Sequence, residues 1–176
     1  MIISTALTNF HQANNLPKDG GENDTFFYIQ FKPFTFKLPN PKFRRKVIHI
    51  HDIQHVLYDC DTSWKGESFI SGWEIATGMW KHLPIGLFSL SGMFVGLFLH
   101  PKEIYNGFKE GLQCESLIDA KIPKEELLNL SISQLKKRLK KNKLVKFNWF
   151  SFLFWCFASI VVSLLPLLVL VSFLIW

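Results

Sequence analysis

Apolar side chains recur at a helical spacing over much of the stretch from residue 43 to residue 146. Between Phe43 and Tyr58 they fall at every third or fourth position, which predicts a helix built on Phe43, Val47, Ile50, Ile53, Val56 and Leu57. A polar break at 59–63 can cap a second helix, expected from about Trp64 to Lys81. Further helices are expected to start at Pro101, near Pro123 and at Ser133. This pattern is typical of an all-α domain.

The segment from Leu83 to Leu99 is uncharged and mostly apolar, and it contains glycines at positions 86, 92 and 96. Its length is at the short limit for a membrane span. Three interpretations are open: a buried core helix, a helix that lines a lipid cavity, and a true span. We favour the first two, because a small domain needs a central apolar helix.

From Phe147 to Trp176 the chain has no ionisable side chain except Cys156. As a helix this segment would reach about 45 Å, against a membrane hydrocarbon core of about 30 Å. Tryptophans near both ends suit the two membrane interfaces. Pro166 should kink the helix, or could divide it into a shallow hairpin. We expect a C-terminal transmembrane tail anchor over 147–176, since so small a body cannot bury it.

Residues 1–40 are predicted to form an aromatic-rich N-terminal arm. Met1 to Leu16 has no basic stretch and does not read as a signal peptide. The stretch from Phe26 to Lys37 is dense in aromatic residues, and Pro33 argues against both a central strand and a regular helix. An extended arm packed over the core is favoured over an arm at the membrane interface, because large apolar side chains are usually buried.

The formal net charge is +6, and the basic residues are clustered. One cluster lies at 42–46, and the other runs from Lys136 to Lys146, directly before the apolar tail. A basic run can bind nucleic acid, but this placement favours anionic lipid headgroups on the cytoplasmic face of a membrane. We therefore expect a membrane protein with its soluble domain in the cytoplasm, no nucleic-acid partner, and three reduced cysteines.

The candidate chemistry lies at His51, Asp52 and His55, followed after eleven intervening residues by Glu67. Histidines four residues apart leave the same face of a helix, so a carboxylate from the next helix could close a site of two nitrogens and two oxygens. Such a set suits zinc, or iron or manganese if positions stay open. Asp52 is either a direct ligand or a partner that orients an imidazole. Tyr58 and Glu74 are candidates to contact the ligand side chains without binding the metal themselves.

The chain resembles the Coq-four family of ubiquinone (coenzyme Q) biosynthesis proteins. The pattern that carries the resemblance is H-D-x-x-H, eleven further residues and then E, on consecutive helices that are followed by an apolar helix. The resemblance covers roughly Phe43 to Lys140. It includes the glycine-containing stretch Tyr105–Gly111 and the segment Lys124–Leu139. Residues 1–40 do not resemble the family's amino-terminal helices, and the apolar tail is an addition.

The resemblance implies an all-α fold in which His51, Asp52, His55 and Glu67 bind a divalent metal, commonly zinc. It also implies an apolar cavity for a prenyl or other long-chain lipid. The family is tied to oxidative removal of the ring carboxyl at carbon one and to assembly with other quinone-biosynthesis proteins. The expected organisation is an arm (1–40), a Coq-four-like metal- and lipid-binding helical domain (41–146) and a transmembrane helix (147–176).

Two functions stay open at this point. One is a metal-dependent oxidative decarboxylase or lyase of lipid-quinone head groups, and the other is a non-catalytic membrane scaffold or lipid-presenting protein with a structural metal. A closed site of four ligands favours the second, and an open coordination position favours the first. The lipid could also be one other than ubiquinone, and a homo-oligomer is compatible with each case.

Overall fold

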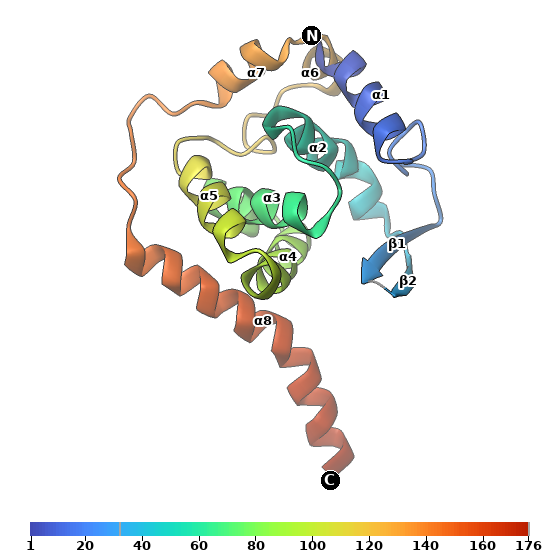
Figure 1. The fold of residues 1–176 in the computed structure, drawn as a ribbon, viewed down its shortest axis with the longest axis vertical. Helices are drawn as coiled ribbons and strands as arrows, with labels where there is room; N and C mark the ends of the chain where they lie inside the picture. The colour runs from blue at the N-terminus through green and yellow to red at the C-terminus, as the bar shows by residue number, and fades with distance from the viewer. Residues whose placement is uncertain (32, 176) are drawn as a thin grey trace.

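The computed structural model describes residues 1–31 and 33–175, with side chains up to Pro166. The chain is mostly helical, with one small two-stranded sheet (Figure 1). The predicted helical class is therefore confirmed, while the sheet departs from the all-α expectation. In chain order the elements are α1 (Ile3–Ala13), β1 (Phe26–Phe31), β2 (Phe34–Pro39), α2 (Lys42–Tyr58), α3 (Trp64–Thr77), the 3-10 helix η1 (Met79–Lys81), α4 (Ile85–Leu99), α5 (Pro101–Gly111), α6 (Lys124–Asn129), α7 (Ile132–Leu139) and α8 (Trp149–Ile175).

Helix α3 lies at the centre of the body and packs against α4 and α5 (Figure 1). Its Trp73 is fully buried. Two glycines allow α3 and α5 to approach closely. A side chain at Gly72 would overlap the backbone of Ile104, and one at Gly107 would overlap the backbone of Phe69. The close approach packs α5 directly against the half of α3 that carries Glu67.

The two helices that carry the candidate ligands form near the predicted positions. Helix α2 begins one residue before Phe43 and ends at Tyr58 as expected. Helix α3 begins at Trp64 but stops at Thr77, four residues short of the expected end. The reason is Gly78, which adopts a left-handed φ of +95° and turns the chain into η1.

The N-terminal residues contribute to the core. Helix α1 packs against α2 and α6, and its Ile3 and Leu7 join a buried cluster with Ile53 and Leu57 of α2. The backbone of Ile3 also donates to the Leu130 carbonyl (2.8 Å). The predicted arm 1–40 thus begins with a helix that is part of the body.

The aromatic stretch that follows is a β-hairpin. Strands β1 and β2 pair antiparallel, with Phe31 opposite Phe34 next to the turn that contains Pro33. Because the proline lies in the turn, it removes no hydrogen bond from either strand. The favoured interpretation of an arm packed over the core is wrong for most of its apolar side chains, since the exposed ones are Phe26, Tyr28, Phe34, Phe36 and Leu38.

Helix α4 is buried on one side only. Gly92 and Gly96 lie against Ser71 and Ser68 of α3, and Met93 between them is fully buried. The other side of the helix is exposed and carries large apolar residues. Helix α4 is therefore neither a fully buried core helix nor an isolated segment.

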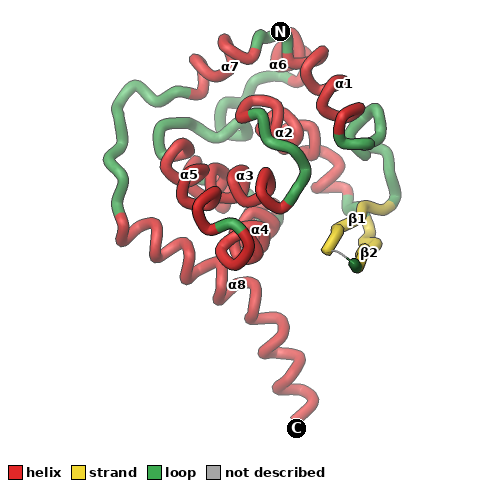
Figure 2. The backbone as a smooth tube through the Cα atoms, in the orientation of Figure 1, coloured by secondary structure: helices red, strands yellow, loops and turns green. Residues whose placement is uncertain are grey.

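The connection from α7 to α8 is a long loop that runs along the outside of the body (Figure 2). It carries the last basic residues before the apolar tail, which are Lys140, Lys141, Lys143 and Lys146. Helix α7 starts one residue before Ser133, because Ser131 forms a capping box with Gln134. The backbone of Lys141 donates to the Gln113 carbonyl (2.8 Å), which holds the loop near the end of α5.

Helix α8 is one continuous helix of 27 residues with Pro166 inside it, so the alternative of a shallow hairpin is wrong. Its first half packs against α4, and its Trp155 meets Trp80 of η1 with ring centroids 4.9 Å apart. Its second half projects away from the body (Figure 1). By length and composition, the part from Trp149 to Pro166 is apolar enough to cross a membrane.

Candidate metal centre

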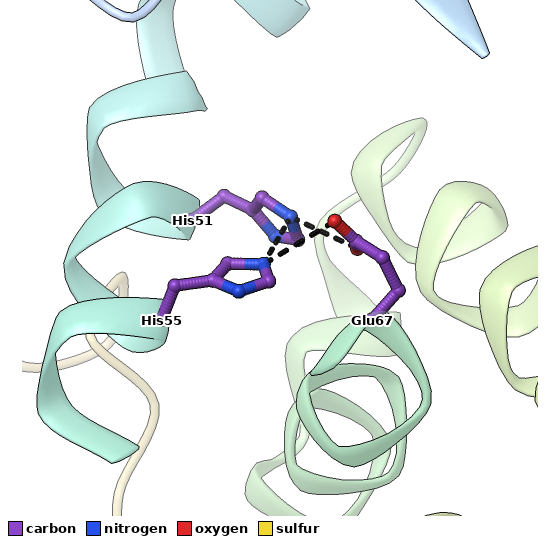
Figure 3. A group of neighbouring side chains, drawn as sticks. All are labelled: His51, His55 and Glu67. Atoms are coloured by element: carbon purple, nitrogen blue, oxygen red, sulfur yellow. Dashed lines mark hydrogen bonds and ion pairs between the residues drawn. The ribbon is translucent and has the colours of Figure 1, made fainter. Parts of the chain in front are cut away.

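Helices α2 and α3 bring three of the predicted ligands together. His51 and His55 lie one turn apart on α2, and Glu67 reaches them from the first turn of α3 (Figure 3). Ser63 begins α3 at this point, because its hydroxyl accepts a hydrogen bond from the Gly66 backbone N–H (3.4 Å). One ligand atom from each of the three residues lies within 4.8 Å of the others.

The spacing of the donor atoms suits a metal ion. His51 Nε2 lies 3.2 Å from His55 Nε2, and each of these nitrogens lies 3.4 Å from one oxygen of the Glu67 carboxylate. A tetrahedral ion with bonds of about 2.1 Å would space its ligand atoms about 3.4 Å apart. Two imidazoles and one carboxylate also form the donor set of catalytic zinc sites and of non-haem iron sites. The residues therefore fit zinc, and they fit iron or manganese as well.

Glu74 holds the His51 ring in the orientation that such a site needs. Its Oε1 lies 3.1 Å from His51 Nδ1, and its Oε2 accepts a hydrogen bond from Ser89 Oγ of α4 (2.6 Å). A proton on Nδ1 donated to Glu74 leaves the lone pair of Nε2 facing His55 and Glu67. Glu74 was one of two candidates to contact the ligands, and its carboxylate lies against His51.

His55 forms the closed, inner side of the centre. Its side chain is fully buried, and the Phe10 ring stacks on it with centroids 5.5 Å apart. Its Nδ1 has no hydrogen-bond partner among the residues that the structure describes. By contrast, the side chains of His51 and Glu67 are each 30% exposed. The centre is therefore reached from the side of His51 and Glu67.

Asp52, the fourth predicted ligand, lies elsewhere. Its Oδ2 is 2.9 Å from Nε2 of His11 on α1, and both side chains are buried. Asp52 is not one of the three residues whose ligand atoms converge. The reason is helical geometry, because neighbouring residues on a helix point about 100° apart. In this arrangement Asp52 joins α2 to α1.

The charges in the centre support one another. Burial alone would lower the pKa of His51, but hydrogen bonds to Glu67 and Glu74 outweigh it and raise that pKa well above its usual value. Burial would likewise raise the pKa of Glu67, yet the adjacent His55 and His51 hold it well below the usual range. Glu67 is thus an ionised carboxylate over the whole neutral range, as a metal ligand must be.

Two residues near the motif serve other contacts. Tyr58 was a candidate to contact the ligands, but its hydroxyl lies 3.5 Å from Cys114 Sγ and its ring packs on Trp73. His49 faces another way on α2, with Nδ1 3.3 Å from Glu22. Sequence reasoning missed Phe10 and Ser89, because neither residue belongs to a recognisable pattern and both come from distant parts of the chain.

The chain matches no protein-family model, and no curated protein or solved structure is significantly similar to it. The resemblance to the Coq-four family therefore stays a prediction that depends on the motif residues themselves.

Proposed function

We propose that this protein is a membrane-bound, divalent-metal-dependent enzyme that modifies the head group of a prenylated or other long-chain lipid. The observation that carries the proposal is the convergence of His51, His55 and Glu67 from two helices. With three protein ligands, a zinc ion keeps a fourth position open, which is the arrangement of catalytic rather than structural zinc sites. An enzyme is therefore favoured over a scaffold with a structural metal.

In this proposal each residue of the centre has a separate task. His51, His55 and Glu67 hold the ion, and Glu74 keeps His51 in the correct tautomer. Phe10 and the buried side of His55 exclude water from behind, while the exposed edges of His51 and Glu67 admit a head group. A bound divalent metal would supply Lewis-acid polarisation of a ring carboxylate or activation of water or oxygen.

The substrate class comes from the motif and from α8. The motif residues resemble those of the Coq-four family, so the specific reaction we propose is the oxidative removal of the ring carboxyl at carbon one in ubiquinone biosynthesis. An apolar α8 beside the body fits a lipid substrate better than a soluble one. Under this proposal α8 anchors the protein, the centre faces the cytoplasm, and other quinone-biosynthesis proteins are its partners.

The first test measures the metal content of full-length protein purified in detergent. We expect about one divalent metal ion per chain, and we expect His51→Ala, His55→Ala and Glu67→Ala each to lose most of it. The matched control is His49→Gln on the same helix, which contacts Glu22 and should keep its metal. Metal content that is unchanged in the three variants would contradict the ligand assignment.

The second test is mass spectrometry of lipid that copurifies with the protein. A prenylated phenol supports the quinone head-group reaction. A different long-chain lipid would support a metal-dependent enzyme that acts on a substrate other than a quinone precursor. The complete absence of bound lipid would count against a lipid substrate.

A further inference from the structure

One face of the β-hairpin is made entirely of apolar residues. Residues opposite each other in an antiparallel pair project to the same side of the sheet. The register places Phe27 opposite Leu38, Ile29 opposite Phe36 and Phe31 opposite Phe34. The other face is mixed, with Gln30 opposite Thr35 and Tyr28 opposite Lys37. Only the apolar face therefore resembles a surface that is normally covered.

The body covers only the β1 half of this face. Phe31 packs on Trp64 with ring centroids 4.6 Å apart, and the Trp64 indole N–H donates to the Gln30 carbonyl (2.8 Å). The β2 half is open, because Phe34 is 66% exposed and Phe36 is 51% exposed. The hairpin is thus fixed to the body while half of its apolar face stays uncovered.

The exposed side of α4 continues this surface. Phe88 of α4 contacts both Phe27 of the hairpin and Phe43 of α2, with ring centroids 6.4 and 5.9 Å apart. At its other edge α4 packs against α8. The exposed apolar residues of α4 are Leu87, Phe88, Phe98 and Leu99. A soluble monomer rarely exposes so extensive an apolar surface without a partner.

The two stretches of chain that form most of this surface carry basic residues and no acidic ones. No acidic residue occurs from Thr25 to His51 or from Ile75 to Lys102. The first of these stretches contains six basic residues. Two of them lie 4.2 Å from the centroid of an aromatic ring of the hairpin: Arg44 over Phe27 on the apolar face, and Lys37 over Phe26 on the mixed face. Aromatic residues beside lysine and arginine are typical of a membrane interface.

We propose that the apolar face of the hairpin and the exposed side of α4 rest on the membrane that α8 crosses, with the basic residues on anionic headgroups. This proposal rests on the membrane-spanning role of α8. A second copy of the chain is a poorer occupant, because a symmetric contact would oppose two basic surfaces. The hairpin, α4 and the point where α8 leaves the body lie at the same end of the molecule (Figure 1).

This contact would place the metal centre close to the lipid head groups. Arg44 and His51 are seven residues apart on α2 and therefore lie on similar faces of the helix. Arg44 also touches the hairpin through Phe27. The open side of the centre would then lie near the headgroup layer, so the head group of a membrane lipid could reach it while its chain stays in the bilayer.

The test uses full-length protein in vesicles of phosphatidylcholine and phosphatidylglycerol that contain spin-labelled lipid. Cys60 and Cys156 are replaced by serine, the buried Cys114 is kept, and one introduced cysteine in each variant carries an environment-sensitive fluorophore. The positions are Phe36→Cys on the hairpin, Val161→Cys on α8 and Ser133→Cys on α7 at the far end of the body. We expect lipid quenching and a blue-shifted emission at 36 and 161, but not at 133. Omitting phosphatidylglycerol should reduce quenching at 36 alone.

The outcomes separate this contact from the proposed anchor. Quenching at 161 with none at 36 would overturn the membrane contact and leave the anchor intact. No quenching at 161 would overturn the anchor and the contact together. If the label at 36 is shielded from aqueous iodide but escapes lipid quenching, another protein surface covers the hairpin, and the proposal is likewise overturned.

Discussion

At the scale of single residues, the candidate centre depends on a carboxylate that does not itself belong to the donor set. Glu74 is buried, and its two oxygens contact His51 and Ser89. Carboxylates in this position orient the imidazole ligand and increase its basicity. Glu74 therefore links the donor set on α2 and α3 to helix α4.

Replacing this carboxylate gives the first prediction. Glu74→Gln keeps the shape of the side chain but removes its charge, so we expect metal affinity to fall about 10- to 100-fold. The measurement is a competition titration with a chelator. Ser89→Ala, which removes one hydrogen bond to Glu74, should cause a smaller loss. Equal affinity in the wild type and Glu74→Gln would show that Glu74 does not position His51.

The buried pair of His11 and Asp52 gives the second prediction. The hydrogen bond that His11 donates to Asp52 is the largest cause of the rise in the pKa of His11 above its usual value of 6.5. Because the folded pKa is the higher one, protonated His11 stabilises the fold fully below about pH 6.5, and this stabilisation is lost as the pH rises through the folded pKa.

The measurement is the melting temperature of the wild type and of His11→Gln in detergent across this pH range. The gap between the two should be largest at acidic pH and should narrow as the pH rises. A gap that does not change with pH would mean that His11 is not charged in the folded protein.

The spacing of His51 and His55 was predictable at this scale because it follows from helical geometry alone. Asp52 was assigned to the same site by its place in the motif. The helix directs it towards α1 instead, where it meets His11. No local sequence pattern predicts the contact between Asp52 and His11, because the two residues are 41 positions apart.

At the scale of elements, α5 packs closely against the part of α3 that carries Glu67. Gly107 of α5 lies directly against the Phe69 backbone, one turn from the start of α3. Gly107→Ala should destabilise the protein by about 1–3 kcal/mol, because the added methyl forces the two helices apart. The check is thermal unfolding in detergent.

The control is Asn106→Ala at the preceding position of α5, where the helix gains a better helix former. Its melting temperature should stay close to that of the wild type. A wild-type melting temperature for Gly107→Ala would show that the two helices can separate at little cost.

At this scale, local sequence patterns were sufficient to predict the bounds of a helix but not the hairpin. The apolar spacing of α2 predicted its range within one residue, because burial of one helix face imposes the period. The hairpin was not predicted, since Pro33 was treated as a break in a single segment. In the fold it lies in a turn between two strands whose pairing is non-local.

At the scale of the whole molecule, the position of the basic loop next to α8 gives a prediction of topology. Lysines directly precede the apolar helix, so we expect from the positive-inside rule that the body lies in the cytoplasm. In intact cells, a cysteine introduced at Ser133 should react with a membrane-impermeant thiol reagent only after the membrane is permeabilised. Labelling in intact cells would reverse the assigned orientation.

The sequence alone determines the helical class, the apolar α8 and the shared face of His51 and His55. Each of these follows from periodicity or composition over a short stretch. Tertiary structure decides that Glu67 completes the donor set, that Glu74 supports it and that Asp52 does not join it. It also decides that the apolar face of the hairpin lies beside α4. The physical reason is that these contacts join segments far apart in the chain, and no local pattern of residues specifies how helices dock.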